Sequence, residues 1–316
     1  MPTPTDTPGA EQDAPSDEGG APSGDATPAG ANPQQVLQDG DSGQPPAFSL
    51  SAPAAQDDPL VRLEAVIQRV GSLPELSMHI SVVGEHLESV SVEDAVFGLD
   101  QLIRRSLTGD LHAPNALLGA VLWLMRQSVE AERDPRANRY DHISALYRVA
   151  SEQRRELVMT FLFDLPAHKT AKILRQNVAR LLKKDLTLGE RKQLARGNNR
   201  QHLEALIHDS DPQVIEKLCN NPSIREQDIL TIVTRRPNKP EILRTIALSE
   251  RWMVRYTVRH ALLLNPYAFT GISIKLLPFL RGTDIRKVSL AGDLHPLMAQ
   301  YAKQLLALRS TRYLKP

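Results

Sequence analysis

Cysteine is almost absent from this sequence, since Cys219 is the only one in 316 residues. A single thiol cannot form an intramolecular disulfide, and it cannot supply the several thiolates of a cysteine-based metal site. The segment around it, IEKLCNNP, places it late in an apolar helical pattern and predicts a buried, unreactive thiol. We therefore expect no disulfide framework, no metal site and no cofactor.

Long apolar runs are also missing. The longest, ALLGAVLWLM at residues 116–125, ends at Arg126 and is far shorter than the roughly 18 uncharged residues that a membrane helix needs. The sequence therefore predicts no membrane segment. Together with the single thiol, this favours a cytoplasmic, reducing compartment.

Basic residues are missing from the first 58 positions, which hold ten acids and a single aromatic residue, Phe48. Pro, Gly, Ala, Ser and Asp dominate there. Such a segment cannot bury enough apolar surface to offset the entropy lost on ordering. We predict a disordered acidic tail over residues 1–58.

Charge is unevenly distributed behind a formal net charge of +1. Residues 61–190 carry equal numbers of acids and bases, whereas residues 191–316 carry 21 Lys and Arg against ten Asp and Glu. We divide the chain after the tail into a helical region at 59–190 and a basic helical-repeat region at 191–316, on this charge difference and on the helix patterns described below. A basic end and an acidic tail on one chain imply either a polyanionic partner or screening of the basic end by the tail.

Catalytic motifs are not recognisable. No HExxH pair, phosphate-binding loop or dinucleotide-binding glycine pattern occurs. The His208-Asp209 dyad is typical of metal phosphohydrolases, but His202 would lie on another face of the same helix. Asp209 and Asp211 are better explained as turn and cap residues before Pro212. We expect no enzyme, although an active site without a motif stays open.

Helical patterns dominate the rest of the chain, and strand-like alternation is nearly absent. Ser91 and Asp94 have capping-box spacing ahead of an apolar stripe over residues 91–107. The segment 115–132 is apolar on most of its surface, which is typical of a helix at the centre of a bundle. Further helices are predicted over residues 151–165, beginning at Ser151, and over 167–184. The fold class predicted is all-α.

From about residue 187 the helix signals become regular. Capping boxes are predicted at 187–190 and 223–226, and Asp211-Pro212 predicts another helix start. Helices should end before Pro222, Pro237, Pro266 and Pro296, which are spaced by 15, 29 and 30 residues.

Three segments of this region share one plan, in which two helices flank a polar turn. Apolar residues eight positions apart flank each turn, and we expect them to be buried. They are Leu206 and Val214, Ile246 and Val254, and Leu277 and Ile285, with Val258 as a seventh core residue. A period near 30 residues predicts a helical bundle that continues into a short α-solenoid.

The segment PEILRTIALSERWMVRYTVRHALLLNP resembles the leucine-rich repeat variant family and its HEAT-like relatives. The matching positions are Pro240, Leu243, Ala247, Val254, Arg255, Val258, Arg259, Asn265 and Pro266. The resemblance covers about residues 198–296 and is specific in one and a half units. It implies a HEAT-like repeat fold and a binding role without catalysis. The iron–sulfur association of some members does not carry over to a chain with one cysteine.

Basic residues are the candidate binding residues. Arg251, Arg255 and Arg259 are spaced four apart, which predicts one stripe along a helix. They either cover the core and pair with acids on neighbouring helices, or they line a groove. The full candidate set is Arg235, Arg236, Arg244, Arg251, Trp252, Arg255, Arg259, Arg281, Arg286 and Lys287. Trp252 and Tyr256 either stack on a partner or belong to the core.

These observations predict a cytoplasmic, bacterial-type scaffold of helical repeats that binds a protein partner without catalysis. The alternative is a nucleic-acid-binding protein that uses the basic region 191–316.

Overall fold

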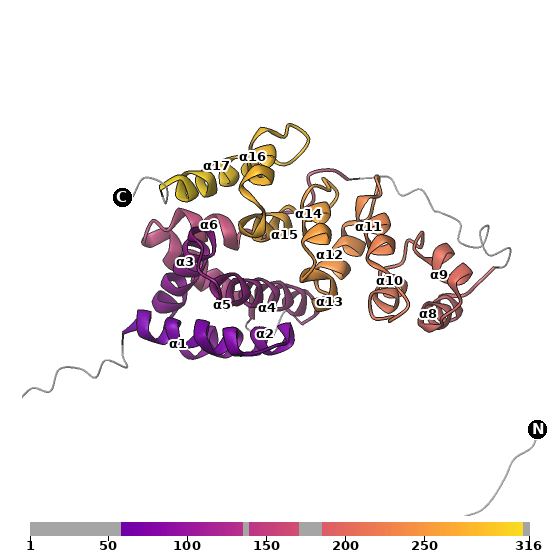
Figure 1. Ribbon diagram of the computed structural model, residues 1–316, viewed down its shortest axis with the longest axis horizontal. Helices are drawn as coiled ribbons and strands as arrows, with labels where there is room; N and C mark the ends of the chain where they lie inside the picture. Colours follow the sequence, from indigo (N-terminus) through magenta and orange to yellow (C-terminus); the bar gives the residue numbers. More distant parts are fainter. Residues whose placement is uncertain (1–57, 135–138, 171–184, 312–316) are drawn as a thin grey trace, which may run out of the picture. The chain divides into compact units, whose positions relative to one another are not determined.

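The computed structural model describes residues 58–134, 139–170 and 185–311. Within these ranges the regular structure is helical, apart from one isolated bridge between Ala167 and Phe269 (Figure 1). The protein is all-α, as predicted. The tail predicted over residues 1–58 lies outside the described residues except for Asp58, and so do residues 171–184 of the helix predicted over 167–184.

Helix α4 lies at the centre of the first group of helices and contacts α1, α2, α3 and α5. Every residue from Ala116 to Met125 is buried, which confirms the prediction of a central apolar helix. The bounds are α1 (Pro59–Ser72), α2 (Leu76–Ser89), α3 (Val92–Thr108), α4 (Ala113–Arg133), α5 (Arg139–Glu152) and α6 (Glu156–Leu162). Among the described helices, none is both long enough and apolar enough to cross a membrane.

Side-chain caps fix several helix starts. Ser91 accepts a hydrogen bond from the Asp94 N–H at the start of α3, and Thr187 forms the predicted capping box with Glu190. Asp211 caps a helix that begins at a proline, also as predicted. The capping box predicted at 223–226 is wrong, because the helix there begins at Glu226 and Arg225 is its N-cap.

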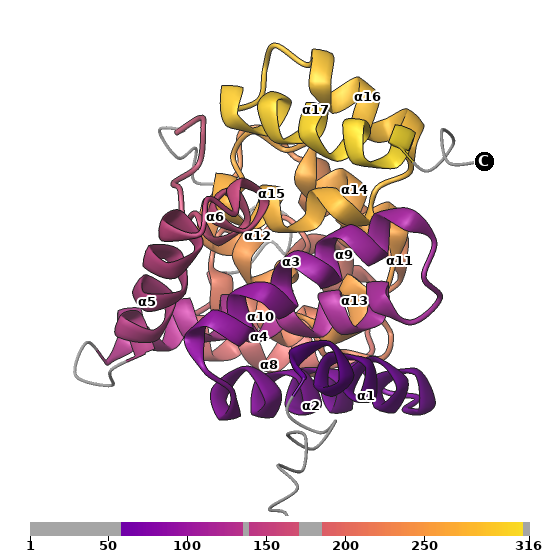
Figure 2. The same ribbon diagram turned by 90° about the vertical axis from the view of Figure 1, so that its left-hand side faces the viewer.

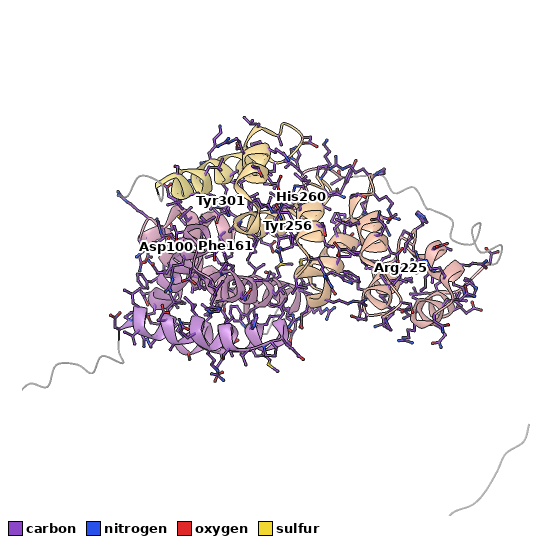
Figure 3. All side chains as sticks on the ribbon, in the orientation of Figure 1. Asp100, Phe161, Arg225, Tyr256, His260 and Tyr301 are labelled. Atoms are coloured by element: carbon purple, nitrogen blue, oxygen red, sulfur yellow. The ribbon has the colours of Figure 1, made fainter. Side chains whose placement is uncertain are left out.

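The helix predicted to begin at Ser151 is also placed differently. Ser151 belongs to the last turn of α5, and Arg154 then adopts a left-handed conformation with φ 53°. The Arg155 guanidinium donates to the buried carboxylate of Asp100 at 2.9 Å, and Arg104 donates to the same oxygen at 2.8 Å. Asp100 therefore ties the turn between α5 and α6 to α3. Figure 3 labels Asp100 beside Phe161, a buried residue of α6.

The second group of helices packs against the first. Helices α16 and α17 lie against one another, and α17 also contacts α3 and α6 (Figure 2). Two ion pairs join the groups, Arg126 with Glu250 and Arg244 with Glu132. The bounds are α8 (Leu188–Arg196), α9 (Arg200–Leu206), α10 (Pro212–Cys219), α11 (Glu226–Thr234), α12 (Pro240–Ala247), α13 (Glu250–Met253), α14 (Tyr256–Leu263), α15 (Thr270–Leu276), η2 (Leu277–Phe279), α16 (Gly282–Leu290) and α17 (Pro296–Thr311).

Two Asn-Pro turns in this group have the same hydrogen-bond pattern. Each Asn side chain donates to two carbonyl oxygens at the end of an earlier helix, and its Oδ1 accepts the N–H two residues later. The pairs are Asn221 with Ala195 and Gly197, and Asn265 with Val233 and Arg235. Both asparagines are buried, and they supply hydrogen-bond donors to carbonyl groups at helix ends.

Six of the seven predicted core residues are fully buried, namely Leu206, Val214, Ile246, Val258, Leu277 and Ile285. Val254 is the exception, because its side chain is 51% exposed. It lies between α13 and α14, at a break in what the sequence predicts as one helix. The prediction for Val254 was therefore wrong.

Candidate functional site

The predicted stripe of Arg251, Arg255 and Arg259 does not exist. Helix α13 ends at Met253, and Arg255 has the extended conformation of an N-cap, with φ −84° and ψ 117°. The four-residue spacing therefore does not place the three side chains on one helix face. Each arginine has a different environment.

Arg251 and Arg259 bind the protein's own backbone. Arg251 donates to the carbonyl oxygens of Asn221 and Ile224, at 2.7 and 3.0 Å. Arg259 donates to the Met253 carbonyl, and burial lowers the pKa of its guanidinium. Both side chains hold turns together, which is the structural interpretation considered above.

Trp252 is buried and cannot stack on a partner. Its indole N–H donates to the Cys219 carbonyl at 3.0 Å, and the Arg251 guanidinium lies over its ring at 4.5 Å. The interpretation of Trp252 as a core residue is therefore the correct one. Cys219 is buried as predicted, and burial raises the pKa of its thiol to about 12.

Three more candidates are engaged with neighbouring groups. Arg235 donates to the Asp209 carbonyl and to Asn238, and burial lowers its pKa. Arg236 donates to the Leu264 carbonyl. Arg244 donates to both carboxylate oxygens of Glu132, at 2.7 and 2.8 Å. Partners inside the chain therefore account for these three cations.

The remaining four candidates are exposed and define what we call the α14–α16 surface: Arg255, Arg281, Arg286 and Lys287. The side chains of Arg255 and Arg286 have no hydrogen-bond acceptor or ion-pair partner among the described residues. The Arg281 guanidinium lies over the Tyr256 ring at 4.9 Å. Lys287 contacts Asp284 at 3.0 Å while its side chain stays 74% exposed.

Tyr256 and Asp284 connect α14 with α16. The Tyr256 hydroxyl donates to Asp284 at 2.5 Å and accepts the Arg281 backbone N–H at 3.2 Å. The hydrogen bond from Tyr256, followed by that from Lys287, lowers the pKa of Asp284. His260 stacks on the Tyr256 ring, and Figure 3 labels both side chains on α14. These contacts connect α14, whose N-cap is Arg255, with α16, which carries Arg286 and Lys287 and whose N-cap is Arg281.

Apolar side chains are exposed beside the same cations. Val254 directly precedes Arg255. Leu290, which is 80% exposed, follows Arg286 by four residues and Lys287 by three on α16, so it shares their helix face. A surface that mixes arginines with exposed aliphatic groups has the composition of a protein-binding patch.

Asp209 is structural. It is completely buried, and both its oxygens accept hydrogen bonds from Arg191 at 2.6 Å. His208 therefore has no available carboxylate partner in the dyad, and burial lowers its pKa. Within the described ranges, no cluster of three or more His, Cys, Asp or Glu side chains could hold a metal ion.

The sequence interpretation did not identify Lys275, a buried lysine that lines a cavity of about 170 Å³. The sequence does contain a sign of this unusual residue, because Lys275 is the only charged residue of the apolar segment GISIKLLPFL. A lysine on the buried side of an apolar helix is unusual. Its apolar neighbours on both sides are typical of a core helix.

Comparison of the chain with known protein families, with curated proteins and with solved structures finds no match. The resemblance to leucine-rich repeat variants therefore stays a prediction. The fold and the contacts described above define the class of this protein as all-α. Its function has to be inferred from the surface and the cavity themselves.

Proposed function

We propose that this protein is a non-catalytic, helical-repeat scaffold of α-solenoid type, which binds an acidic surface of a protein partner through the α14–α16 surface. The observation that carries the proposal is the exposure of Arg255 and Arg286 without acceptors in the described chain. Six of the ten basic and aromatic candidates are committed to contacts inside the protein. The four that remain lie at the start of α14 and at the start and along the length of α16.

Charge complementarity supports an acidic partner, and the exposed Val254 and Leu290 favour a protein over a nucleic acid. Arginine is enriched in protein interfaces, and the fully buried centre of an interface is more apolar than the rest of the surface. Asp284 contacts Lys287, and Asp293 lies 3.6 Å from Arg236, so carboxylates would interrupt a continuous track for a phosphate backbone. The net excess of eleven positive charges in residues 191–316 keeps nucleic acid as the second candidate.

The proposal can be tested by titrating the full chain with poly-L-glutamate and with duplex DNA, each at about 0.05 M and about 0.3 M salt. The test variant combines Arg255→Glu, Arg286→Glu and Lys287→Glu. The matched control combines Arg69→Glu, Arg148→Glu and Lys303→Glu, which changes the same number of exposed cations elsewhere.

We expect the test variant to weaken poly-L-glutamate binding by about tenfold or more at low salt, and the control variant to weaken it only slightly. Equal losses in both variants would show that no localised surface exists. Tight DNA binding with a steep salt dependence, together with no binding of poly-L-glutamate, would instead support the second candidate.

A further inference from the structure

A cavity of about 170 Å³ lies between the end of α4, the segment 164–166, α12 and α15. Its apolar lining residues are Met125, Val129, Leu165, Pro166, Phe269 and Ile272. An apolar protein cavity of about 150 Å³ is large enough to hold benzene. The space therefore suits a small molecule with a hydrocarbon body.

Lys275 brings a positive charge to this lining. Its side chain is 5% exposed, and its ammonium group donates to the carbonyl oxygens of Phe163 at 2.9 Å and Gly271 at 3.4 Å. An ammonium group has three donors, so one donor is left beyond these two neutral acceptors. Among the described residues, no carboxylate lies within ion-pair distance of this nitrogen.

The other charged groups in the lining do not neutralise Lys275. Glu132 is bound by Arg244 through both oxygens, and the Arg244 guanidinium lies over the Phe269 ring. Asp164 is exposed to solvent and acts on Lys275 only at longer range. Because a buried charge without a counter-ion is costly, a ligand that supplies an anion gains free energy here.

We propose that this cavity binds a small monocarboxylate with an apolar body. Its carboxylate accepts a hydrogen bond from the Lys275 ammonium group, and its hydrocarbon part packs between Val129, Phe269 and Ile272. This site is independent of the α14–α16 surface. The apolar walls select against strongly hydrated anions such as inorganic phosphate.

Burial and charge state agree with this assignment. Burial lowers the pKa of Lys275 to about 8, and the field of Asp164 only partly opposes this effect. A bound carboxylate favours the charged ammonium, so binding is strongest below pH 8 and is lost as the pH rises through that value. Glu132, Asp164 and Arg244 are the other charged groups that face the cavity.

The test uses the full chain with benzoate and hexanoate as probes, and benzamide and hexanamide as neutral controls. Calorimetry and the shift in melting temperature report binding. Val129→Phe fills the cavity and retains Lys275, whereas Lys275→Met removes the charge. Lys303→Met is the matched control, because Lys303 is exposed on α17.

We expect at least one of the two carboxylates to bind the wild type at least about tenfold more tightly than its amide, since hydrogen bonds to charged groups are the stronger ones. Val129→Phe and Lys275→Met should each remove that binding, and Lys303→Met should retain it. If Lys275→Met fails to fold, Val129→Phe alone decides. Equal binding of acids and amides, absence of carboxylate binding at about 10 mM, or unchanged binding by Val129→Phe would overturn the proposal.

Discussion

Val254 and Val258, four residues apart, have opposite environments. Val258 is fully buried, whereas Val254 is 51% exposed. Val258→Ala should lower the free energy of unfolding by about 1–4 kcal/mol, because it leaves a cavity in the core. Val254→Ala should change it by less than about 0.5 kcal/mol. Urea denaturation measures both values, and similar costs for the two variants would contradict the assigned burial.

Lys275 should make stability depend on pH. Its pKa is about 8 in the folded protein and 10.5 in the ordinary reference state. Between these values the unfolded chain holds more protons than the folded chain, so the free energy of unfolding rises with pH. The gain in the free energy of unfolding is complete above pH 10.5. It is lost as the pH falls from 10.5 through 8.

Relative to Lys275→Met, the wild type should therefore gain up to about 3 kcal/mol of stability between pH 8 and 10.5. Denaturant titrations of both proteins across this range give the difference, in which the other titrating groups cancel. Parallel curves for the two proteins would mean that Lys275 titrates normally.

At the scale of helices and turns, the two buried asparagines connect helices that are distant in sequence. Asn221→Ala should lower the free energy of unfolding by about 1–3 kcal/mol, because the Ala195 and Gly197 carbonyls lose their donor. The neighbouring Asn220 is exposed, so Asn220→Ala is a matched control with an expected change below about 0.5 kcal/mol. Equal effects of the two substitutions, measured by thermal denaturation, would refute this role of Asn221.

Helix starts were predictable where their cause is local. Ser91, Thr187 and Asp211 each cap a helix through an N–H two or three residues away, and the sequence shows that spacing directly. The break at Val254 and Arg255 has no proline or glycine to mark it. Next to this break, Arg251 contacts carbonyl groups about 30 residues earlier in the chain. Sequence periodicity cannot reveal such long-range contacts.

The candidate site shows the same difference between features with a local cause and features that depend on contacts between distant segments. The basic residues can be listed from the sequence as one group, but which of them are bound inside the protein depends on the carbonyl or carboxylate groups that lie nearby in space. Arg251 and Arg244 find acceptors in distant segments, whereas Arg255 and Arg286 do not. The cavity at Lys275 also needs four separate segments, so only its unusual lysine was visible beforehand.

On the scale of the whole molecule, the charge is divided between an acidic beginning and a basic end. Residues 1–57 carry nine acids and no Lys or Arg, so their removal changes the formal net charge from +1 to +10. Asp58 should be kept, because its side chain caps α1. The composition of the removed segment predicts a flexible chain with a root-mean-square span of roughly 40 Å.

Such a segment would compete with acidic ligands as a diffuse negative charge. Deleting residues 1–57 should therefore tighten the binding of poly-L-glutamate at low salt, and the gain should shrink near about 0.3 M salt, where screening is strong. A control chain with the nine acids replaced by Asn or Gln should gain as much as the deletion, because charge rather than length is the cause. Combining the deletion with Arg255→Glu, Arg286→Glu and Lys287→Glu should abolish most of the gain. Unchanged affinity after deletion would show that the acidic segment does not compete for this surface.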